Sequence, residues 1–371
     1  MTEKEKKYIE GIGWRYDLEH SMLRRRDGHD YTSRCIYMLT LTLEDRSLPL
    51  LGTLAGEPDS EENPPHTQAT PLGEQVTEEC QQLHAEYPQL SILRCQLMPD
   101  HLHLVIYVRD TLPIHLSKII GKLKNRCNKH YWAQLTAAGR LGAKGVEKPP
   151  RLFSQNFQDS ILTHSGQLEA MICYVEENPR RALIKRRHRD LFTVVGSLEF
   201  GGHTYAAVGN RWLLERPMRL QVRCHNNTTA QNLRLIELQR EYFLSRGQEG
   251  AVIVSPCISE GEKQIATAAL EAKIPLIVLL ENGFSPLFKP SGKYFYACAE
   301  GLLLMLAPWP YHMQKQKITR QQCLALNDMA ASASTEPWTP ALEEWLQSKD
   351  REGDGEDGAC DGEGGMTVSE A

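Results

Sequence analysis

The segment from Met98 to Tyr107 carries two histidines, His101 and His103, separated by one apolar residue. Apolar residues then recur along it with a period of two, which is typical of a β-strand whose side chains alternate between the two faces of a sheet. The two histidines are therefore expected on one face, where two imidazoles can bind one divalent metal ion. A buried strand with two packed histidines is the alternative. The opposite face is expected to pack through Leu102, Leu104 and Ile106.

A second segment, residues 165–178, has apolar residues at helical spacing and is expected to form a helix. We expect Pro179 to end it, because the residue before a proline disfavours the helical conformation. Tyr174 and Asn178 stand four positions apart and would lie on one helical face. A phenol and an amide oxygen can then reach one site, the phenol to attack and the amide to complete a metal shell. For this segment alone, a surface tyrosine near a helix end is the alternative.

Taken together, the two segments resemble the REP-associated tyrosine transposases, a branch of the single-tyrosine His-hydrophobic-His (HUH) transposases. In that family a Met-Pro-x-His-x-His strand precedes a helix with Tyr-x-x-x-Asn-Pro-x-x-Ala. Both patterns are present here, at residues 98–103 and 174–182. A basic helix expected at 116–132 and the segment 152–159 lie between them, in the family's order. The resemblance covers roughly residues 30–195, about half of the chain.

The resemblance implies an α+β, ferredoxin-like HUH domain at residues 34–191, an antiparallel sheet with helices on one face. It implies a metal-dependent single-strand DNA endonuclease and strand transferase that cuts and rejoins DNA at hairpin or repeat sequences. Tyr174 would be the catalytic nucleophile, and His101, His103 and Asn178 would hold Mg²⁺ or Mn²⁺. A tyrosine nucleophile keeps the energy of the broken bond in a 5′-phosphotyrosine intermediate. The cation would stabilise charge that develops on the scissile phosphate.

The net charge of −5 is unevenly distributed along the chain. Between Lys118 and Arg189 there are fifteen Lys and Arg against five Asp and Glu, whereas eight acidic residues follow Lys349. Clustered basic residues can neutralise nucleic-acid phosphates, although a solvated helix face is the alternative. The residues expected to contact DNA are Lys118, Lys122, Lys124, Arg126, Lys129, Arg180, Arg181, Lys185, Arg186 and Arg187.

Several sequence features bear on the cellular setting. No run of 18 apolar residues is present, the first residues lack the apolar core of a secretory signal, and the ten cysteines form no C-x-x-C pair. We therefore expect a cytoplasmic protein with reduced thiols and no membrane contact, and the resemblance implies that it is bacterial and nucleoid-associated. Its expected partner is single-stranded DNA with hairpin structure, and both a monomer and a homodimer remain open.

Residues 192–345 are expected to form a smaller, Rossmann-like α/β domain. Continuous apolar runs at 251–255, 275–280 and 302–307 alternate with helical patterns, which is typical of parallel strands buried on both faces. Residues 254–262 and 277–283 resemble the Rossmann-type domain of the DNA-processing protein A (DprA) group. In that group a glycine-rich loop at a helix N-terminus favours phosphate, whereas here only Gly261 remains. A structural or partner-binding role is at least as well supported.

The two ends of the chain are charged. Residues 1–33 have no role that the sequence assigns, and the glycine-rich acidic segment 346–371 is expected to be a disordered tail.

Two main functions remain open: an active transposase, and a domesticated DNA-binding protein that acts on repeats without cleaving them. The intact nucleophile favours the first, because a binding module has no need of it. A metal-dependent phosphodiesterase that uses water ranks below both, since the histidine motif offers no general base except Asp100.

Overall fold

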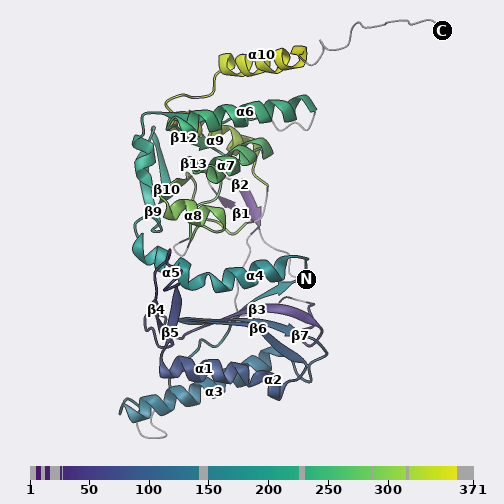
Figure 1. Ribbon diagram of the computed structural model, residues 1–371, viewed down its shortest axis with the longest axis vertical. Coiled ribbons are helices and arrows are strands. Elements are labelled where there is room, and N and C mark those ends of the chain that lie inside the picture. The colour runs from purple at the N-terminus through teal and green to yellow at the C-terminus, as the bar shows by residue number, and fades with distance from the viewer. Residues whose placement is uncertain are drawn as a thin grey trace, which may run out of the picture. The chain divides into compact units, whose positions relative to one another are not determined.

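The computed structural model describes residues 6–9, 13–16, 26, 28–141, 149–224, 230–285, 288–314 and 317–356. The chain divides into two compact units (Figure 1). The N-terminal unit is His20–Arg187, and the C-terminal unit is His188–Ala371 together with Met1–Glu19. No helix in the described ranges combines the length and the hydropathy needed to cross a membrane.

The N-terminal unit is built on a four-stranded antiparallel sheet with the order β6-β7-β3-β8. With α1 following β3 and α3 following β7, this is the split β-α-β arrangement of ferredoxin-like domains. The histidine strand β7 is central, so its register is fixed from both sides: His103 lies opposite Thr40 of β3 and Gln96 of β6. The strands are β3 (Cys35–Thr42), β6 (Leu90–Met98), β7 (His101–Val108) and β8 (Gln158–Leu162).

The two faces of this sheet are covered by different helices. Leu102, Leu104 and Ile106 are fully buried in one core cluster with apolar residues of α1 (Pro71–Gln81) and α3 (Leu116–Ala137). The helix α4 (Gln167–Glu176) contacts β6 and β7, and Figure 1 shows it on the side of the sheet opposite α1 and α3. The prediction of helices on one face is therefore wrong, because the tyrosine helix covers the histidine face.

Two further features precede the histidine strand. Residues 71–86 contain two helices, α1 and the short α2 (Leu83–Glu86). The strand β5 (His66–Ala69) pairs with β4 (Gly52–Ala55) in a separate two-stranded sheet. Its alternation is too short to stand out from the surrounding turn residues.

The tyrosine helix is shorter than the sequence predicts, and Pro179 does not end the helical structure. A new helix, α5 (Asn178–Arg187), begins at Asn178. Pro179 occupies its first turn, where the missing N–H costs no hydrogen bond. Tyr174 therefore lies in the last turn of α4, whereas Asn178 opens the next helix.

The C-terminal unit contains a six-stranded mixed sheet with the order β11-β12-β13-β14-β10-β9. The first four strands are parallel, β10 is antiparallel to β14, and β9 forms a hairpin with β10. Every residue of β12, β13 and β14 is buried, as their continuous apolar runs predict. The strands are β9 (Val195–Phe200), β10 (His203–Gly209), β11 (Arg219–Gln221), β12 (Val252–Ser255), β13 (Leu276–Leu279) and β14 (Leu303–Ala307).

Helices pack on both faces of this sheet. One core cluster joins it to α6, α7 and α8, and a second joins its other face to α9 and the 3₁₀ turn η1. A further hairpin pairs β1 (Lys6–Ile9) with β2 (Gly13–Tyr16). The helical segments are η1 (Arg211–Glu215), α6 (Ala230–Gln248), α7 (Glu260–Glu271), α8 (Lys293–Ala299), α9 (Arg320–Ala333) and α10 (Pro340–Glu356).

The predicted disordered tail at 346–371 is wrong in its first part, because residues 346–356 belong to α10. Leu346 is buried, and the Trp345 ring lies 5.8 Å from the Tyr242 ring of α6 between centroids. Apolar contacts therefore hold the start of a segment whose acidic composition suggested disorder. Residues 357–371 lie outside the described residues.

We expect the core behind the histidine strand to dominate the stability of the N-terminal unit. Leu104→Ala removes a fully buried side chain and should lower the free energy of unfolding by about 2–5 kcal/mol. Leu93→Ala on β6, where the side chain is 38% exposed, is the matched control, with a change within about 1 kcal/mol. Denaturant unfolding measures both, and equal losses would contradict the assignment of this face to the core.

Candidate active site

The two histidines of β7 face each other. Their Nε2 atoms are 3.1 Å apart, and the ring planes are inclined by 84°. The Nδ1 atom of His101 lies 2.6 Å from the Asp100 carboxylate, and that of His103 lies 2.9 Å from the Thr40 hydroxyl. Because both Nδ1 atoms have other partners, the two Nε2 atoms are the ring nitrogens that can bind a common metal ion.

The separation of the two Nε2 atoms fits a shared metal ion. Two adjacent ligands of an octahedral cation, each about 2.1 Å from it, are about 3.0 Å apart. Asp100 can only accept a hydrogen bond when ionised, so the proton of a neutral His101 is on Nδ1 and its Nε2 is a lone-pair donor. The donor set suits Mn²⁺ better than Mg²⁺, since imidazole nitrogen is a softer ligand than oxygen.

Asp100 orients His101 through the ring nitrogen that does not face His103. Its Oδ2 atom accepts hydrogen bonds from Arg46 Nε at 2.9 Å and Arg46 Nη2 at 2.7 Å, while Oδ1 meets His101. Burial disfavours ionisation, but the bonds from His101 and Arg46 outweigh it and hold the pKa of the Asp100 carboxyl well below its usual range. An ionised Asp100 therefore fixes the tautomer and orientation of His101, as outer carboxylates do for metal-binding histidines.

His103 is neutral over the physiological pH range. It is 5% exposed, and burial, helped by the nearby His101, lowers its pKa to about 3. A neutral imidazole keeps the lone pair that a metal ion requires.

Tyr174 reaches the histidine pair from α4. Its ring centroid is 6.2 Å from that of His103, and the guanidinium carbon of Arg181 lies 5.5 Å from its centroid. The side chain is 40% exposed, and within the described ranges its hydroxyl makes no hydrogen bond. Arg94 of β6 and Glu176 of α4 form an ion pair of 2.8 Å that links the tyrosine helix to the sheet.

Asn178 is not joined to the histidines in the same way. In the part of the chain that the structure describes, no hydrogen bond connects it to either ring, and its Nδ2 atom is buried without a partner. Nor do the described residues contain a group of three or more His, Cys, Asp or Glu placed to hold a metal. The site so described offers two nitrogens, and the role of Asn178 as a third ligand stays a prediction.

The predicted DNA contacts of Lys124 and Arg126 on α3 need correction. Lys124 is 7% exposed and donates to two backbone carbonyls at 2.8 and 2.7 Å. Arg126 donates to the carboxylates of Glu79 and Glu86 at 2.6 Å each. Both charges are paired or hydrogen-bonded within the protein, so these two residues are no longer expected to bind DNA.

The remaining basic residues of α3 also lie on a helix that covers the face opposite the histidines. Lys122 donates to the Tyr87 hydroxyl at 2.8 Å, whereas Lys118 and Lys129 are exposed. Because these lysines lie beyond the face opposite the histidines, they cannot reach DNA bound at the histidine pair from the same side of the sheet. The other predicted basic residues are on α5, which follows the tyrosine helix, and of these Arg181 contacts the Tyr174 ring. They are Arg180, Arg181, Lys185, Arg186 and Arg187.

In the C-terminal unit, the backbone donors before α7 are already occupied. Glu262 is 2% exposed, and its Oε2 atom accepts from the backbone N–H groups of Ile258 at 2.7 Å and Ser259 at 2.9 Å. Ser259 caps the helix in return. A Cβ at Gly261 would lie 3.0 Å from Ile236 of α6, so this glycine permits helix packing. A side-chain carboxylate therefore stands where a Rossmann loop would hold phosphate.

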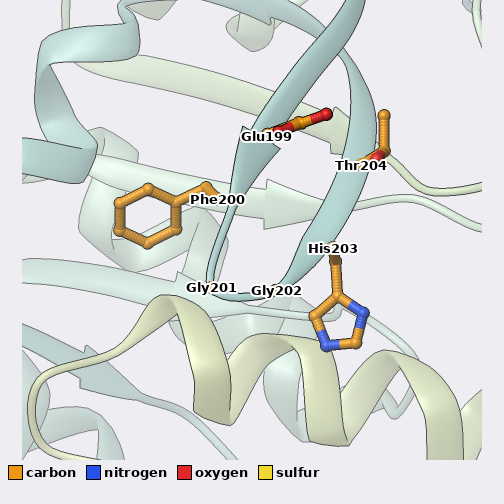
Figure 2. Close-up of a pocket in the computed structure, with 6 residues that line it drawn as sticks. All are labelled: Glu199, Phe200, Gly201, Gly202, His203 and Thr204. Atoms are coloured by element: carbon orange, nitrogen blue, oxygen red, sulfur yellow. The ribbon is translucent and has the colours of Figure 1, made fainter.

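A hollow at the β9–β10 hairpin of the same unit contains none of the predicted site residues (Figure 2). It is lined by residues 199–204, including the turn Gly201–Gly202. In Figure 2, Phe200 and His203 point away from each other on either side of the turn. The hollow brings no reactive groups together, and we assign it no function.

Sequence reasoning missed Thr40, Arg46 and Arg94, which position the two histidines and the tyrosine helix. The pairing of β3 with β7 brings Thr40 to His103, and the turn of the chain after β3 brings Arg46 to Asp100. Neither forms a motif with the histidines along the chain, so the sequence carries no local signal for them.

No protein-family model matches the chain, and no curated protein matches it. Among solved structures it is similar to a REP-associated tyrosine transposase bound to a REP hairpin, with 13% identity, a TM-score of 0.29, and coverage of 43% of this chain and 74% of that one. It is also similar to a putative transposase from Deinococcus radiodurans R1, with 16% identity, a TM-score of 0.24, and coverage of 42% and 98%.

A third similar structure is DNA processing protein A from Helicobacter pylori, whose structure concerns single-stranded DNA binding. The identity is 19%, the TM-score 0.28, and the coverage 38% of this chain and 66% of that one. These values give a weak link between folds and do not assign the chain to a family.

We expect His103 to make the protein sensitive to mild acid when no metal is present. The unfolded chain takes up a proton at this histidine below about pH 6.5, whereas the folded protein does so only near pH 3. The free energy of unfolding should therefore fall as pH falls from 6.5, by up to about 1.4 kcal/mol per unit. Denaturant titrations with EDTA between pH 6.5 and 5 measure this slope.

The matched variants for this measurement are His103→Gln, which should flatten the slope, and His66→Gln at an exposed position, which should not. The pH range of the measurement, from 6.5 to 5, lies above the range in which the Asp100 carboxyl titrates, because the pKa of that carboxyl is lowered. Equal slopes in the wild type and His103→Gln would contradict a neutral buried His103.

We expect Glu262 to stabilise the C-terminal unit and to exclude phosphate from α7. Glu262→Ala leaves the N–H groups of Ile258 and Ser259 without their acceptor and should cost about 2–3 kcal/mol. Glu260→Ala, at an exposed position of the same helix, should cost less than about 1 kcal/mol. Thermal unfolding of the wild type should not change with millimolar ATP or phosphate, and a rise in Tm would refute the exclusion.

Proposed function

We propose that the N-terminal unit is a metal-dependent single-strand DNA endonuclease and strand transferase with Tyr174 as its nucleophile. The proposed substrate is single-stranded DNA with hairpin or repeat sequences, as the resemblance to REP-associated tyrosine transposases implies. Nucleoid association and a homodimer remain predictions that accompany this proposal.

One observation carries the proposal. The half-exposed Tyr174, whose phenol has no hydrogen-bond partner in the described chain, lies against His103, and the Nε2 atom of His103 is 3.1 Å from that of His101. A tyrosine that served only packing would be buried or bonded through its hydroxyl. A histidine pair that served only packing would not need the ionised Asp100 and Arg46 behind it. The arrangement therefore combines an available nucleophile with a site for a cation.

Strand cleavage is a single displacement at the phosphorus atom. The Tyr174 oxygen attacks phosphorus, a bond forms between them, and the bond from phosphorus to the 3′ oxygen breaks. The phenolic proton passes to solvent and the leaving 3′ oxygen takes one up, which yields a 5′-phosphotyrosine and a free 3′-hydroxyl. The reverse attack by a 3′-hydroxyl joins strands.

The residues around the nucleophile prepare this step. Asp100 and Thr40 hold His101 and His103 so that both Nε2 atoms can bind Mg²⁺ or Mn²⁺. When bound there, the cation supplies positive charge that stabilises the reacting phosphate. Arg181 lies over the Tyr174 ring and adds a second positive charge beside the position of attack.

A DNA-binding protein that does not cleave is the second candidate. One observation favours it, namely that the described site offers only two metal ligands and leaves Asn178 without a contact to them. An incomplete set of metal ligands is compatible with a protein that still binds DNA but has lost the ability to cleave it. Covalent capture of DNA separates the two candidates.

The test incubates the protein with Mn²⁺ or Mg²⁺ and a labelled pool of single-stranded hairpin oligonucleotides, and resolves protein–DNA adducts on a denaturing gel. The wild type should form an adduct that EDTA prevents, and Tyr174→Phe should form at least about 100-fold less, since it lacks the nucleophilic oxygen. His101→Ala should lose most of the adduct as well.

Tyr107→Phe is the matched control. Tyr107 occupies the same face of β7, but its hydroxyl accepts a 2.8 Å hydrogen bond from Arg34. This variant should keep its adduct. Binding without an adduct under every metal and hairpin would instead support the protein that does not cleave.

A further inference from the structure

An acidic loop lies against the basic helix α5. The loop joins β4 to β5 and carries four carboxylates within six residues, at Glu57, Asp59, Glu61 and Glu62. Asp59 Oδ1 is 3.4 Å from Arg180 Nη2, and Asp59 Oδ2 is 3.9 Å from Arg187 Nη1. The two arginines are seven residues apart and so lie on one face of the helix. One carboxylate therefore sits between two guanidinium groups.

The loop holds Asp59 in this place through its own structure. Both strands that flank it, β4 and β5, contact α5. Backbone bonds close the loop from Glu57 N–H to Asn63 O at 3.0 Å and from Ser60 N–H to Glu57 O at 3.2 Å. A Cβ at Gly56, whose φ is +89°, would lie 2.4 Å from the Pro64 carbonyl oxygen. The acidic loop is thus a closed turn, and it presents Asp59 at a set position on α5.

The contact has the properties of one that another anion can replace. The side chains of Asp59, Arg180 and Arg187 are 77%, 43% and 54% exposed, and ion pairs this exposed contribute little to stability. The contact with Asp59 also does not satisfy every hydrogen-bond donor of Arg180, because the Nε atom is buried without a hydrogen-bond partner. A phosphate carries more acceptor oxygens than one carboxylate oxygen at 3.4 Å, and it can engage a guanidinium through two bonds.

We propose that Asp59 stands in for a phosphate, occupying in the free protein the Arg180–Arg187 pair that binds a backbone phosphate of single-stranded DNA. The acidic loop then sets a threshold for binding, since DNA must displace Asp59 before it gains this pair. This inference rests on the proposed function through DNA binding alone and does not need cleavage. Asp59 thereby becomes a residue that determines selectivity on the nucleic-acid surface of α5.

The test measures the binding of a fluorescein-labelled oligo(dT) strand by anisotropy in EDTA, so that no cleavage occurs. Asp59→Asn should lower the Kd at least about threefold at low salt, and the gain should vanish at high salt, where exposed charges are screened. Glu61→Gln is the matched control: it removes the same charge from the same loop, but has no ion pair to α5 among the described residues. It should change the Kd less than about twofold, as an effect of net charge alone.

A second pair of variants tests the mechanism. Adding Arg180→Gln and Arg187→Gln to Asp59→Asn should abolish the gain, because the freed arginines produce it. Equal Kd values for Asp59→Asn and Glu61→Gln, or a gain that survives loss of both arginines, would overturn the inference while leaving the proposed function intact. Absence of binding by every protein at low salt would overturn both. Thermal unfolding should show the same Tm for Asp59→Asn and the wild type, and a large loss would instead assign the contact to folding.

Discussion

The central position of β7 determines the geometry of the candidate site. The strand pairs with β3 on one side and β6 on the other, and four of its side chains, Leu102, Leu104, Ile106 and Val108, are fully buried in the core cluster that includes α1 and α3. Slipping the strand by one residue would move Leu102, Leu104 and Ile106 to the face that α4 covers and turn both histidines into the core. Each buried side chain of this size contributes about 1.5–3 kcal/mol. The core thus keeps the histidines on the face that α4 covers, although it contacts neither Nε2 atom.

The tyrosine helix is held by much weaker interactions than the strand it covers. Val175 is the one residue of α4 that is fully buried, and the ion pair between Arg94 and Glu176 is half exposed. Tyr174 therefore stands on a weakly anchored helix, while His101 and His103 stand on a strand that is paired on both sides. The proposed strand transfer would use this difference, because the tyrosine would carry a DNA end whereas the proposed cation site would keep its shape.

What the sequence predicts well is local and periodic. The alternation along residues 98–107 is sufficient to place the histidines on one face, and the apolar runs at 252–255 and 276–279 are sufficient to predict buried parallel strands. What it does not predict depends on pairing between distant segments. Thr40 reaches His103 only through the register of β3.

The charge pattern of α3 shows a second limit of sequence reasoning. A basic helix next to a DNA-binding motif looks the same whether it faces solvent or faces carboxylates from another helix. Glu79 lies on α1, so its bond to Arg126 cannot be read from either segment alone. The two units also differ in how far they satisfy their buried carboxylates. Glu262 accepts from the backbone N–H groups of Ile258 and Ser259, just before α7. Asp100 instead fixes His101 with its Nε2 lone pair turned toward a second histidine. This network ends on the 3.1 Å contact between the two histidine Nε2 atoms, a contact that a bound cation would replace. For this reason we assign the proposed chemistry to the histidine face of the N-terminal unit.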